Sequence, residues 1–256
     1  MTLAAESPFV DDLRPSPCFE PRRRGLTASM LILHYTGMTS CARAIDWLSR
    51  EESRVSCHYV IDVDGRITQM VSELHRAWHA GHAAWKGESD VNSMSIGFEI
   101  HNPGHDYGYP DFPDCQMRAV TDLARDVVRR WAIPPERVLA HSDVAPHRKN
   151  DPGEKFDWRR LADEGVGLWV EPAPIESTDD PANSAADPNV VAHAQRLMMA
   201  FGYELEPTGW MDERTQLVVI AFQRHFRPAR VDGILDRSTM ATLERVLAAV
   251  PTALLA

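Results

Sequence analysis

The chain has 256 residues and a formal net charge of −10, with 44% hydrophobic and 25% charged residues. This length and composition suit a globular protein with one sizeable core and a small second one. Because proteins that bind nucleic acids usually carry a basic surface, the acidic balance argues against nucleic acid as the main partner. No apolar segment of the sequence is long enough to span a membrane.

The start of the chain shows no targeting signal. Residues 1–15, which we expect to be an N-terminal extension, lack a basic start followed by an apolar segment. The four cysteines show none of the close spacings of a redox or zinc motif, so we expect them to be reduced. The prediction is a cytoplasmic protein. The periplasm or cell envelope is the alternative, because a chain trimmed of its leader would look the same.

Residues 16–170 alternate strand and helix signals. An apolar run ends at His34, and a helix is expected around residues 42–49. Residues 59–62 and 67–71 flank an Asp-Gly turn, which predicts a β-hairpin.

The pattern continues along the rest of this region. Glu99 lies on the next predicted strand, and a helix over residues 115–131, capped by Asp114, leads into a strand that ends at His141. We predict an α/β catalytic domain over residues 16–170, in which a mixed β-sheet is flanked by helices.

Two histidines and one aspartate are candidate metal ligands. His34 and His141 each end a short apolar run, so each would lie at the end of a buried strand, where backbone pairing fixes its direction. Asp151 stands in an Asp-Pro-Gly segment, whose turn can aim the carboxylate toward His141. Catalytic zinc takes three such ligands and keeps a fourth position for water, whose pKa it lowers. The set therefore indicates a hydrolytic zinc site.

Other interpretations of the histidines stay open. The chain has 11 histidines, and a lone histidine is more often a surface or hydrogen-bonded core residue than a ligand. A rival cluster of His75, His79 and His82 could collect a metal on a local loop, but it lacks a nearby carboxylate on a firm element. His147 lies between two of the proposed ligands and could compete for the metal.

Several ordered motifs over residues 16–170 resemble a known family. They are Leu33-His34-Tyr35-Thr36, Trp78-His79-Ala80-Gly81, the strand 95–100, His141-Ser142-Asp143 and Asp151-Pro152-Gly153. These motifs look like those of the zinc-dependent N-acetylmuramoyl-L-alanine amidases of the AmpD-like and AmiD-like type, which share a fold with peptidoglycan recognition proteins. The resemblance implies cleavage of the amide between the lactyl group of N-acetylmuramic acid and the L-alanine that begins the stem peptide.

The resemblance also implies roles for single residues. His34, His141 and Asp151 match the zinc ligands, Glu99 matches the acidic residue beside the zinc, and Lys149 matches the lysine two positions before the last ligand. The chemistry agrees. Glu99 can take a proton from water and pass it to the leaving nitrogen, which is worth about 10²- to 10⁴-fold in rate, and Lys149 can stabilise the oxyanion. The alternative for Glu99 is an ion-paired residue at a strand edge. The alternative for Lys149 is a charged side chain that is solvated at the surface.

Residues 76–81 are expected to line the substrate groove. The indole of Trp78 can lie against sugar or peptide, and the basic groups of Arg76 and His79 can meet carboxylates of the stem peptide. A structural role for Trp78 in the core is the open alternative.

The composition changes after residue 170. Residues 171–188 are rich in Pro, Ala, Ser, Asp and Glu, which is typical of a linker, and residues 189–251 hold three amphipathic stretches that predict a small all-α, three-helix domain. Segments such as Ala221-Phe222-Gln223 and Val231-Asp232-Gly233-Ile234 resemble the peptidoglycan-binding module of wall hydrolases. We expect wall binding by the module as a whole and no catalytic group within it.

The expected module and the expected compartment favour different substrates. A wall-binding module suits polymeric peptidoglycan, because tethering raises the local concentration of cleavable bonds, whereas a cytoplasmic enzyme would meet small recycled muropeptides, with or without the anhydro form of the sugar. Two other functions stay open, namely a protein that recognises muropeptides without cutting them and a zinc peptidase acting within the stem peptide. Their products differ, since an amidase frees an intact stem peptide.

Overall fold

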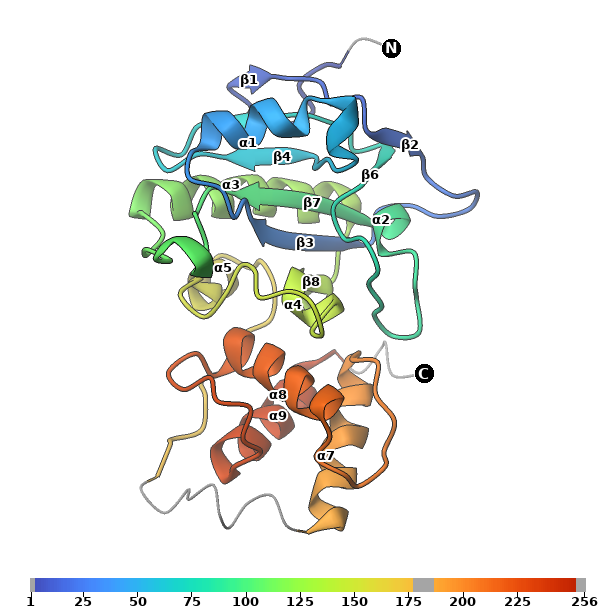
Figure 1. The fold of residues 1–256 in the computed structure, drawn as a ribbon, viewed down its shortest axis with the longest axis vertical. Helices are drawn as coiled ribbons and strands as arrows, with labels where there is room; N and C mark the ends of the chain where they lie inside the picture. The colour runs from blue at the N-terminus through green and yellow to red at the C-terminus, as the bar shows by residue number, and fades with distance from the viewer. Residues whose placement is uncertain (1–2, 177–186, 252–256) are drawn as a thin grey trace.

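The computed structural model describes residues 3–176 and 187–251, and a six-stranded mixed sheet occupies the upper part of Figure 1. The strand order is β1–β5–β4–β7–β3–β8; β4 and β5 are antiparallel, and the other neighbours are parallel. The strands span Asp12–Leu13 (β1), Met30–Tyr35 (β3), Tyr59–Ile61 (β4), Ile67–Gln69 (β5), Ser95–Ile100 (β7) and Val138–Ala140 (β8). The mixed sheet and its β4–β5 hairpin confirm the prediction.

Strands β3 and β7 fix the direction of the site residues. Successive side chains of β3 alternate between the two faces of the sheet, so that Ile32 and Leu33 are buried in different apolar clusters. His34 follows on the face of Ile32 and lies opposite Glu99 in the parallel register. Because neighbouring strands are about 4.8 Å apart, the register alone brings this imidazole and this carboxylate side by side.

Helices cover both faces of the sheet (Figure 1). Helix α3, Asp114–Trp131, packs on the face of Leu33, and helix α1, Cys41–Leu48, packs on the opposite face over β4. The predicted cap of α3 is wrong, because Asp114 is the first helical residue and the cap position is held by Pro113. The Asp114 carboxylate instead pairs with Arg160 at 2.7 Å.

Shorter elements complete this part of the chain. Strands β2 and β6 pair in a second, antiparallel sheet, and single helical turns connect the longer elements. These elements are Phe19–Pro21 (β2), Glu51–Ser53 (η1), His75–Ala77 (β6), Val91–Met94 (α2), His105–Tyr107 (η2), Pro135–Arg137 (η3), His141–Val144 (α4) and Trp158–Asp163 (α5). Strand β1 lies within the segment predicted as an N-terminal extension, so the sheet begins before the predicted boundary at residue 16.

Three helices follow, as predicted, and we call residues 187–251 the C-terminal helical domain. The helices are α7 (Pro188–Phe201), α8 (Glu213–Phe226) and α9 (Arg237–Ala249). Each is capped by the aspartate before it, since Asp187, Asp212 and Asp236 accept hydrogen bonds from backbone N–H groups two or three residues later. Within the predicted linker, residues 177–186 lie outside the described residues.

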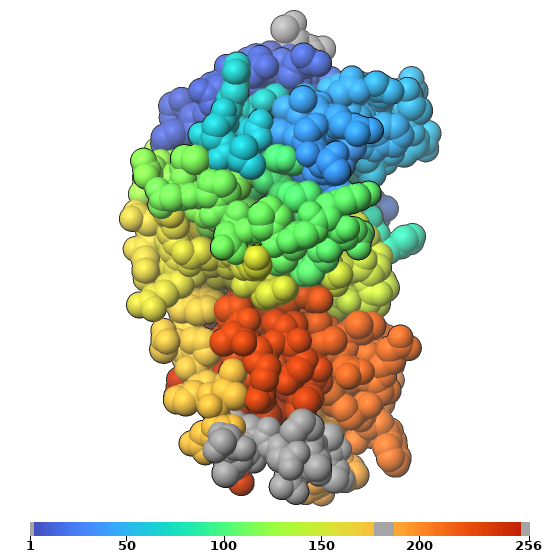
Figure 2. Space-filling model, turned by 60° about the vertical axis from the view of Figure 1, so that its left-hand side comes forward, coloured from blue at the N-terminus to red at the C-terminus, as the bar shows by residue number. Residues whose placement is uncertain are grey.

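The C-terminal helical domain packs directly on the sheet domain. One apolar cluster joins Ile32 and Trp85 of the sheet domain to Phe201 and Phe222 of the helices. The buried Trp85 ring lies edge-on to Phe201 and Tyr203, at centroid distances of 5.3 and 5.1 Å. Figure 2 shows the orange and red surface of the helices continuous with the yellow and green surface above it. The two predicted domains therefore share a core.

Two further findings concern the chain as a whole. All four cysteines are free thiols. Within residues 3–176 and 187–251, no helix combines the length and the apolar character that crossing a membrane requires.

Candidate metal centre and active site

The three predicted metal ligands meet at the edge of the sheet. His34 Nδ1 lies 2.8 Å from His141 Nδ1 and 3.1 Å from Asp151 Oδ2, and the third separation, from His141 Nδ1 to Asp151 Oδ2, is 2.9 Å. All three side chains are buried. In the described part of the chain, this is the only group of histidine, cysteine and acidic side chains with the geometry to hold a metal ion. Neither the rival histidine cluster nor His147 forms such a group.

Three different elements carry these ligands. His34 lies near the end of β3, and His141 is the first residue of α4, directly after β8. Because β3 and β8 are parallel neighbours, their carboxyl ends bring the two imidazoles together. Asp151 follows on a loop, where its carbonyl accepts a hydrogen bond of 3.0 Å from the Ser142 N–H and so fastens the loop to α4.

A chain of hydrogen bonds behind His34 determines which ring nitrogen faces the site. The Ser95 hydroxyl donates to the Val91 carbonyl at 2.7 Å, so its oxygen accepts from His79 Nε2 at 3.1 Å. His79 Nδ1 is then unprotonated and accepts from His34 Nε2 at 2.9 Å. Burial, with a contribution from His34, lowers the pKa of His79 well below 6.5, which keeps this ring neutral. His34 therefore presents the lone pair of Nδ1 to the site.

The protonation states of the three candidate ligands also suit a cation. His141 Nε2 donates to the Ala80 carbonyl at 3.2 Å, which leaves the lone pair on Nδ1. Burial and the neighbouring His141 lower the pKa of His34 to about 4, so the His34 ring is neutral at physiological pH. Burial would raise the pKa of Asp151, but a proton on Nδ1 of His141 or His34 lowers it well below its usual range, and a metal cation in the same place acts in the same direction. The carboxylate is therefore ionised when the site holds a positive charge.

The cluster has more acceptors than donors. Two imidazole lone pairs and a carboxylate oxygen face one another, and such a set is stable when a cation lies between its members. A tetrahedral metal ion with bonds of about 2.0 Å holds its ligand atoms about 3.3 Å apart. The observed separations of 2.8 to 3.1 Å are close to that value. The residues thus fit a metal ion.

Gly97 makes room for the support behind His34. It lies on β7 between Ser95 and Glu99, and a Cβ atom at this position would lie 2.5 Å from Cγ of His79. Side chains do not approach one another so closely. The His79 ring can therefore lie against the strand only because residue 97 has no side chain.

Glu99 stands beside the ligands and lines the cavity above them. Its Oε2 atom is buried and has no hydrogen-bond partner among the described residues. Burial raises the pKa of Glu99 well above its usual value, the negative charge of Asp151 adds to this, and Lys149 opposes it. A half-buried carboxyl group with one buried, unpaired oxygen in a cavity is suited to exchange a proton with a bound molecule.

A cavity of about 330 Å³ opens over the ligands. Its walls are formed by His34, Tyr35, Thr36, Gly37, Met38, Ala44, Trp47, Leu48, Val55, Ser56, Trp78, His79, Glu99, His141, Lys149 and Asp151. Trp47, which is 41% exposed, and Trp78 give it aromatic surface, and the Arg54 guanidinium lies 5.7 Å from the centre of the Trp78 ring. Lys149 adds a positive charge beside the acidic Glu99. The cavity offers apolar faces and charged groups to one ligand.

The structure brings only some of the predicted substrate-binding residues to this cavity. Trp78 and His79 line it, but both ring nitrogens of His79 are engaged by His34 and Ser95. Arg76 lies outside the cavity walls, and its guanidinium pairs with Asp90 at 3.1 Å and with Glu20 at 2.7 Å.

Sequence reasoning missed Trp47 as a wall residue, and it placed His79 in the substrate groove without its role in supporting His34. Trp47 stands on α1, where the helical pattern gives no reason to expect a cavity wall. The support of His34 by His79 depends on a contact between residues 45 positions apart. No local sequence pattern predicts such contacts. The unusual density of histidines around residue 79 is a signal that could have pointed to the support of His34 by His79.

Family models match both parts of the chain. Residues 24–154 match the model described as N-acetylmuramoyl-L-alanine amidase, and residues 187–243 match the model described as "Putative peptidoglycan binding domain". The chain is 34% identical over 233 residues to the N-acetylmuramoyl-L-alanine amidase AmiD of Escherichia coli (strain K12), and this match covers 85% of the chain and 82% of AmiD.

Two solved structures are similar along most of the chain. The complex of AmiD from E. coli with the substrate anhydro-N-acetylmuramic acid-L-Ala-D-γ-Glu-L-Lys has a TM-score of 0.73 at 32% sequence identity, and the match covers 90% of this chain and 92% of that chain. AmpDh3 from Pseudomonas aeruginosa in complex with anhydromuramic pentapeptide has a TM-score of 0.71 at 30% identity, with 87% and 91% covered.

Proposed function

The chain belongs to the N-acetylmuramoyl-L-alanine amidase family, and we propose that it uses zinc held by His34, His141 and Asp151 to hydrolyse anhydromuropeptides. The bond cleaved by this family joins the lactyl group of N-acetylmuramic acid to L-alanine. The observation that carries the zinc site is the triangle of lone-pair atoms, each within 3.1 Å of the other two. The anhydro form is supported by the two related structures, whose bound molecules carry the anhydro sugar.

The ligand set favours zinc over harder cations. Mg²⁺ and Ca²⁺ prefer sites made of oxygen atoms, whereas two imidazoles with one carboxylate are typical of catalytic zinc. When bound, the ion polarises the substrate carbonyl and lowers the pKa of a water molecule. The chain itself fixes the ligands, because His79 and the Ala80 carbonyl each hold the distal nitrogen of one imidazole.

We assign proton transfer to Glu99. Its carboxylate takes a proton from the attacking water and delivers it to the alanine nitrogen as the C–N bond breaks, so the leaving group departs as a neutral amine. Lys149 lines the same cavity and stabilises the negative charge that develops on the carbonyl oxygen. Amide hydrolysis needs both contributions, because the carbonyl is a poor electrophile and the nitrogen a poor leaving group.

The cavity supports a muropeptide as the substrate. Trp47 and Trp78 offer flat apolar faces on which a sugar ring can pack. Lys149 in the cavity wall supplies positive charge for the carboxylates of the stem peptide, and Arg54 adds positive charge beside Trp78. Peptidoglycan binding by the C-terminal helical domain is supported by its match to the binding-domain model. The cytoplasmic location and the preference between small and polymeric substrates stay predictions.

Mass spectrometry of anhydromuropeptides incubated with zinc-loaded protein tests the function. We expect the parent protein to release an intact stem peptide that begins with L-alanine, and Glu99→Gln to release it about 10²- to 10⁴-fold more slowly while retaining zinc. A shortened stem peptide would identify a peptidase instead. No release by a zinc-bound parent would identify a protein that recognises muropeptides without cutting them, and equal rates in both proteins would remove Glu99 from proton transfer.

The metal is tested by reconstitution. Dialysis against a chelator should abolish release of the stem peptide, and Zn²⁺ should restore it where Mg²⁺ does not. Activity that survives chelation, in protein shown to be metal-free, would contradict the zinc assignment.

A further inference from the structure

Asp143 is buried where the sheet domain meets the C-terminal helical domain. It is the third residue of α4, two positions after the ligand His141, and it is 1% exposed. Its Oδ1 accepts a hydrogen bond from the Tyr203 hydroxyl at 2.7 Å, and its Oδ2 accepts from His225 Nδ1 at 2.7 Å and from the Ala140 N–H at 2.8 Å. Two of these three donors come from the helical domain, and the third precedes a metal ligand.

Packing holds both side-chain donors in place. The His225 ring stacks between Trp158 and Phe226, at centroid distances of 3.7 and 3.9 Å. The Tyr203 ring is 3% exposed and lies edge-on to Trp85. Burial, with the charge of the neighbouring carboxylate, raises the pKa of Tyr203 well above its usual value, so its hydroxyl stays protonated and can donate. The contact is therefore made by fixed groups.

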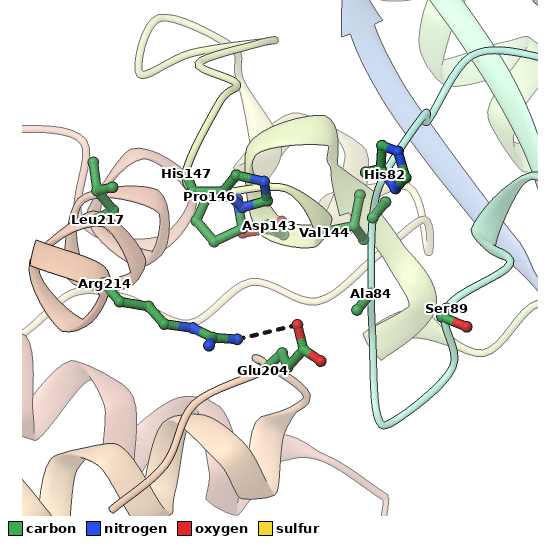
Figure 3. A pocket seen from close by; sticks show the side chains of 11 residues that line it. His82, Ala84, Ser89, Asp143, Val144, Pro146, His147, Glu204, Arg214 and Leu217 are labelled. Carbon is green, nitrogen blue, oxygen red and sulfur yellow. Dashed lines mark hydrogen bonds and ion pairs between the residues drawn. The ribbon is translucent and has the colours of Figure 1, made fainter. Parts of the chain in front are cut away.

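Figure 3 shows Asp143 from the side of the cleft that lies between the two parts of the molecule. Asp143 and His147 line the cleft from the sheet domain, and Glu204 and Arg214 line it from the helical domain. The two parts are also joined by a backbone hydrogen bond of 2.8 Å, which the Lys86 N–H donates to the carbonyl of residue 202. A domain that served only as a mobile tether would need none of these contacts.

We propose that Tyr203 and His225 are positioning residues of the amidase site, which act through Asp143 to hold the first turn of α4 and thus His141 in the geometry that binds the metal. The proposal rests on the proposed function in one respect, namely that His141 is a metal ligand. It gives the C-terminal helical domain a part in catalysis that is separate from binding peptidoglycan.

The shortness of α4 is the physical reason for this dependence. The helix has four residues, so its direction is set by the groups that hold its ends. The Asp143 carboxylate holds the Ala140 N–H, and the Ser142 N–H holds the Asp151 carbonyl. A buried carboxylate that loses a hydrogen-bond donor is destabilised until it finds another donor. For Asp143, this requires a movement of α4, which carries it. Groups that orient metal ligands typically change metal affinity or activity by about 10- to 100-fold when they are removed.

Substitutions in the full-length protein test the proposal. Tyr203→Phe removes one hydroxyl, and His225→Leu removes a donor while leaving an apolar side chain between the two aromatic rings. His225→Asn returns an N–H group near the position of Nδ1. We expect Tyr203→Phe and His225→Leu each to weaken zinc affinity about 10-fold, measured by competition with a chromophoric chelator, and to lower kcat about 10-fold with little change in KM. His225→Asn should recover most of both losses.

Arg214→Gln is the matched control. It breaks an ion pair of 3.1 Å with Glu204 in the same cleft, where both side chains are more than half exposed, and it should leave zinc affinity and kcat at parental values. Parental zinc affinity in both Tyr203→Phe and His225→Leu would overturn the proposal, whatever happens to thermal stability. Because zinc affinity is measured without substrate, it decides this proposal even if the parent releases no stem peptide, which is the result that refutes the proposed function.

Discussion

Helix α4 carries three buried polar side chains, and the surroundings of two of them, His141 and Asp143, differ in one respect. Both are almost fully buried, and both contact a histidine from a distant part of the chain. Around Asp143, three N–H or O–H groups point at two carboxylate oxygens. Around His141 Nδ1, the neighbours within 3 Å are the Nδ1 of His34 and an oxygen of Asp151, which both carry lone pairs.

This difference separates a structural polar cluster from a functional one. Neither burial nor residue type distinguishes the two, because both are buried and both combine histidine with aspartate. A carboxylate whose two oxygens both accept hydrogen bonds is stable as it stands, whereas a group with an excess of acceptors requires a cation or a proton. The count of donors therefore predicts which cluster binds a metal.

Removing a ligand should have the largest effect. Asp151→Ala takes away the one anionic ligand, so we expect metal binding to weaken and kcat/KM to fall about 10³-fold or more, because a bound metal supplies several kcal/mol of transition-state stabilisation. Metal content and release of stem peptide measure the two losses. Asp163→Ala is the control, since this carboxylate on α5 is 71% exposed. Parental activity in Asp151→Ala would show that the cluster is not the catalytic site.

Removing the hydrogen bond that His79 makes with His34 should have the next largest effect on metal binding. His79→Leu removes the acceptor for His34 Nε2, and we expect a 10- to 100-fold weaker affinity for zinc. His79→Asn keeps an amide oxygen that can take the place of Nδ1, so it should recover part of the loss. Equal affinities in the two variants, measured by chelator competition, would contradict the hydrogen-bond chain that runs from Ser95 to the ligand.

His58 extends the comparison to a buried histidine whose hydrogen bonds are complete. Its Nδ1 accepts from the Gly97 N–H at 2.9 Å, and its Nε2 donates to the His75 carbonyl at 3.1 Å. Burial and the charge of Arg22 lower its pKa from 6.5 to about 3. Since the unfolded chain takes up this proton more readily, the stability that depends on the neutral ring is complete above pH 6.5. It is lost as the pH falls toward 3, by about 2 kcal/mol between pH 6.5 and pH 5.

Urea unfolding of chelator-treated protein at several pH values measures this loss. The variant His58→Asn retains an acceptor for Gly97 but has no proton to gain. Its free energy of unfolding should therefore depend on pH with a slope that is smaller by about one proton over the same range. Identical slopes in the parent and the variant would show that His58 is not neutral in the folded protein.

The smallest effect is expected at Arg76. Its guanidinium pairs with Asp90 and with the half-exposed Glu20, outside the walls of the cavity. Arg76→Gln should leave KM for muropeptides unchanged and lower the free energy of unfolding by about 1 kcal/mol, because Arg23 still pairs with Asp90 at 2.8 Å. Steady-state kinetics measure KM. A large rise in KM without a change in stability would return Arg76 to the substrate-binding residues predicted from the sequence.

The main sheet and the ligand triangle could be predicted because local patterns encode them. His34 and His141 each close an apolar run, and the carboxyl ends of parallel strands meet at one edge. The cap of α3 could not be predicted, because a cap depends on the backbone angles of one residue, and Pro113 and Asp114 both suit the start of a helix.

The packing of the C-terminal helical domain on the sheet domain also could not be predicted from the sequence. Its helical periodicity shows which side chains are apolar, but it does not show whether they face one another or another domain. Phe201 and Phe222 belong to the same cluster as Ile32, a partner about 170 to 190 positions away. The composition of the linker pointed to a tether, whereas the contacts of Asp143 join the two parts of the chain.

The parallel register of β3 and β7 fixes the distance between His34 and Glu99. Because His34 and Glu99 are register partners, the spacing between the proposed metal ligand and the proposed acid–base group is set by backbone hydrogen bonds, which are the same for every side chain. Protein engineers can therefore reshape the loops around the cavity to change which molecules enter, while the distance between these two groups remains as the sheet sets it.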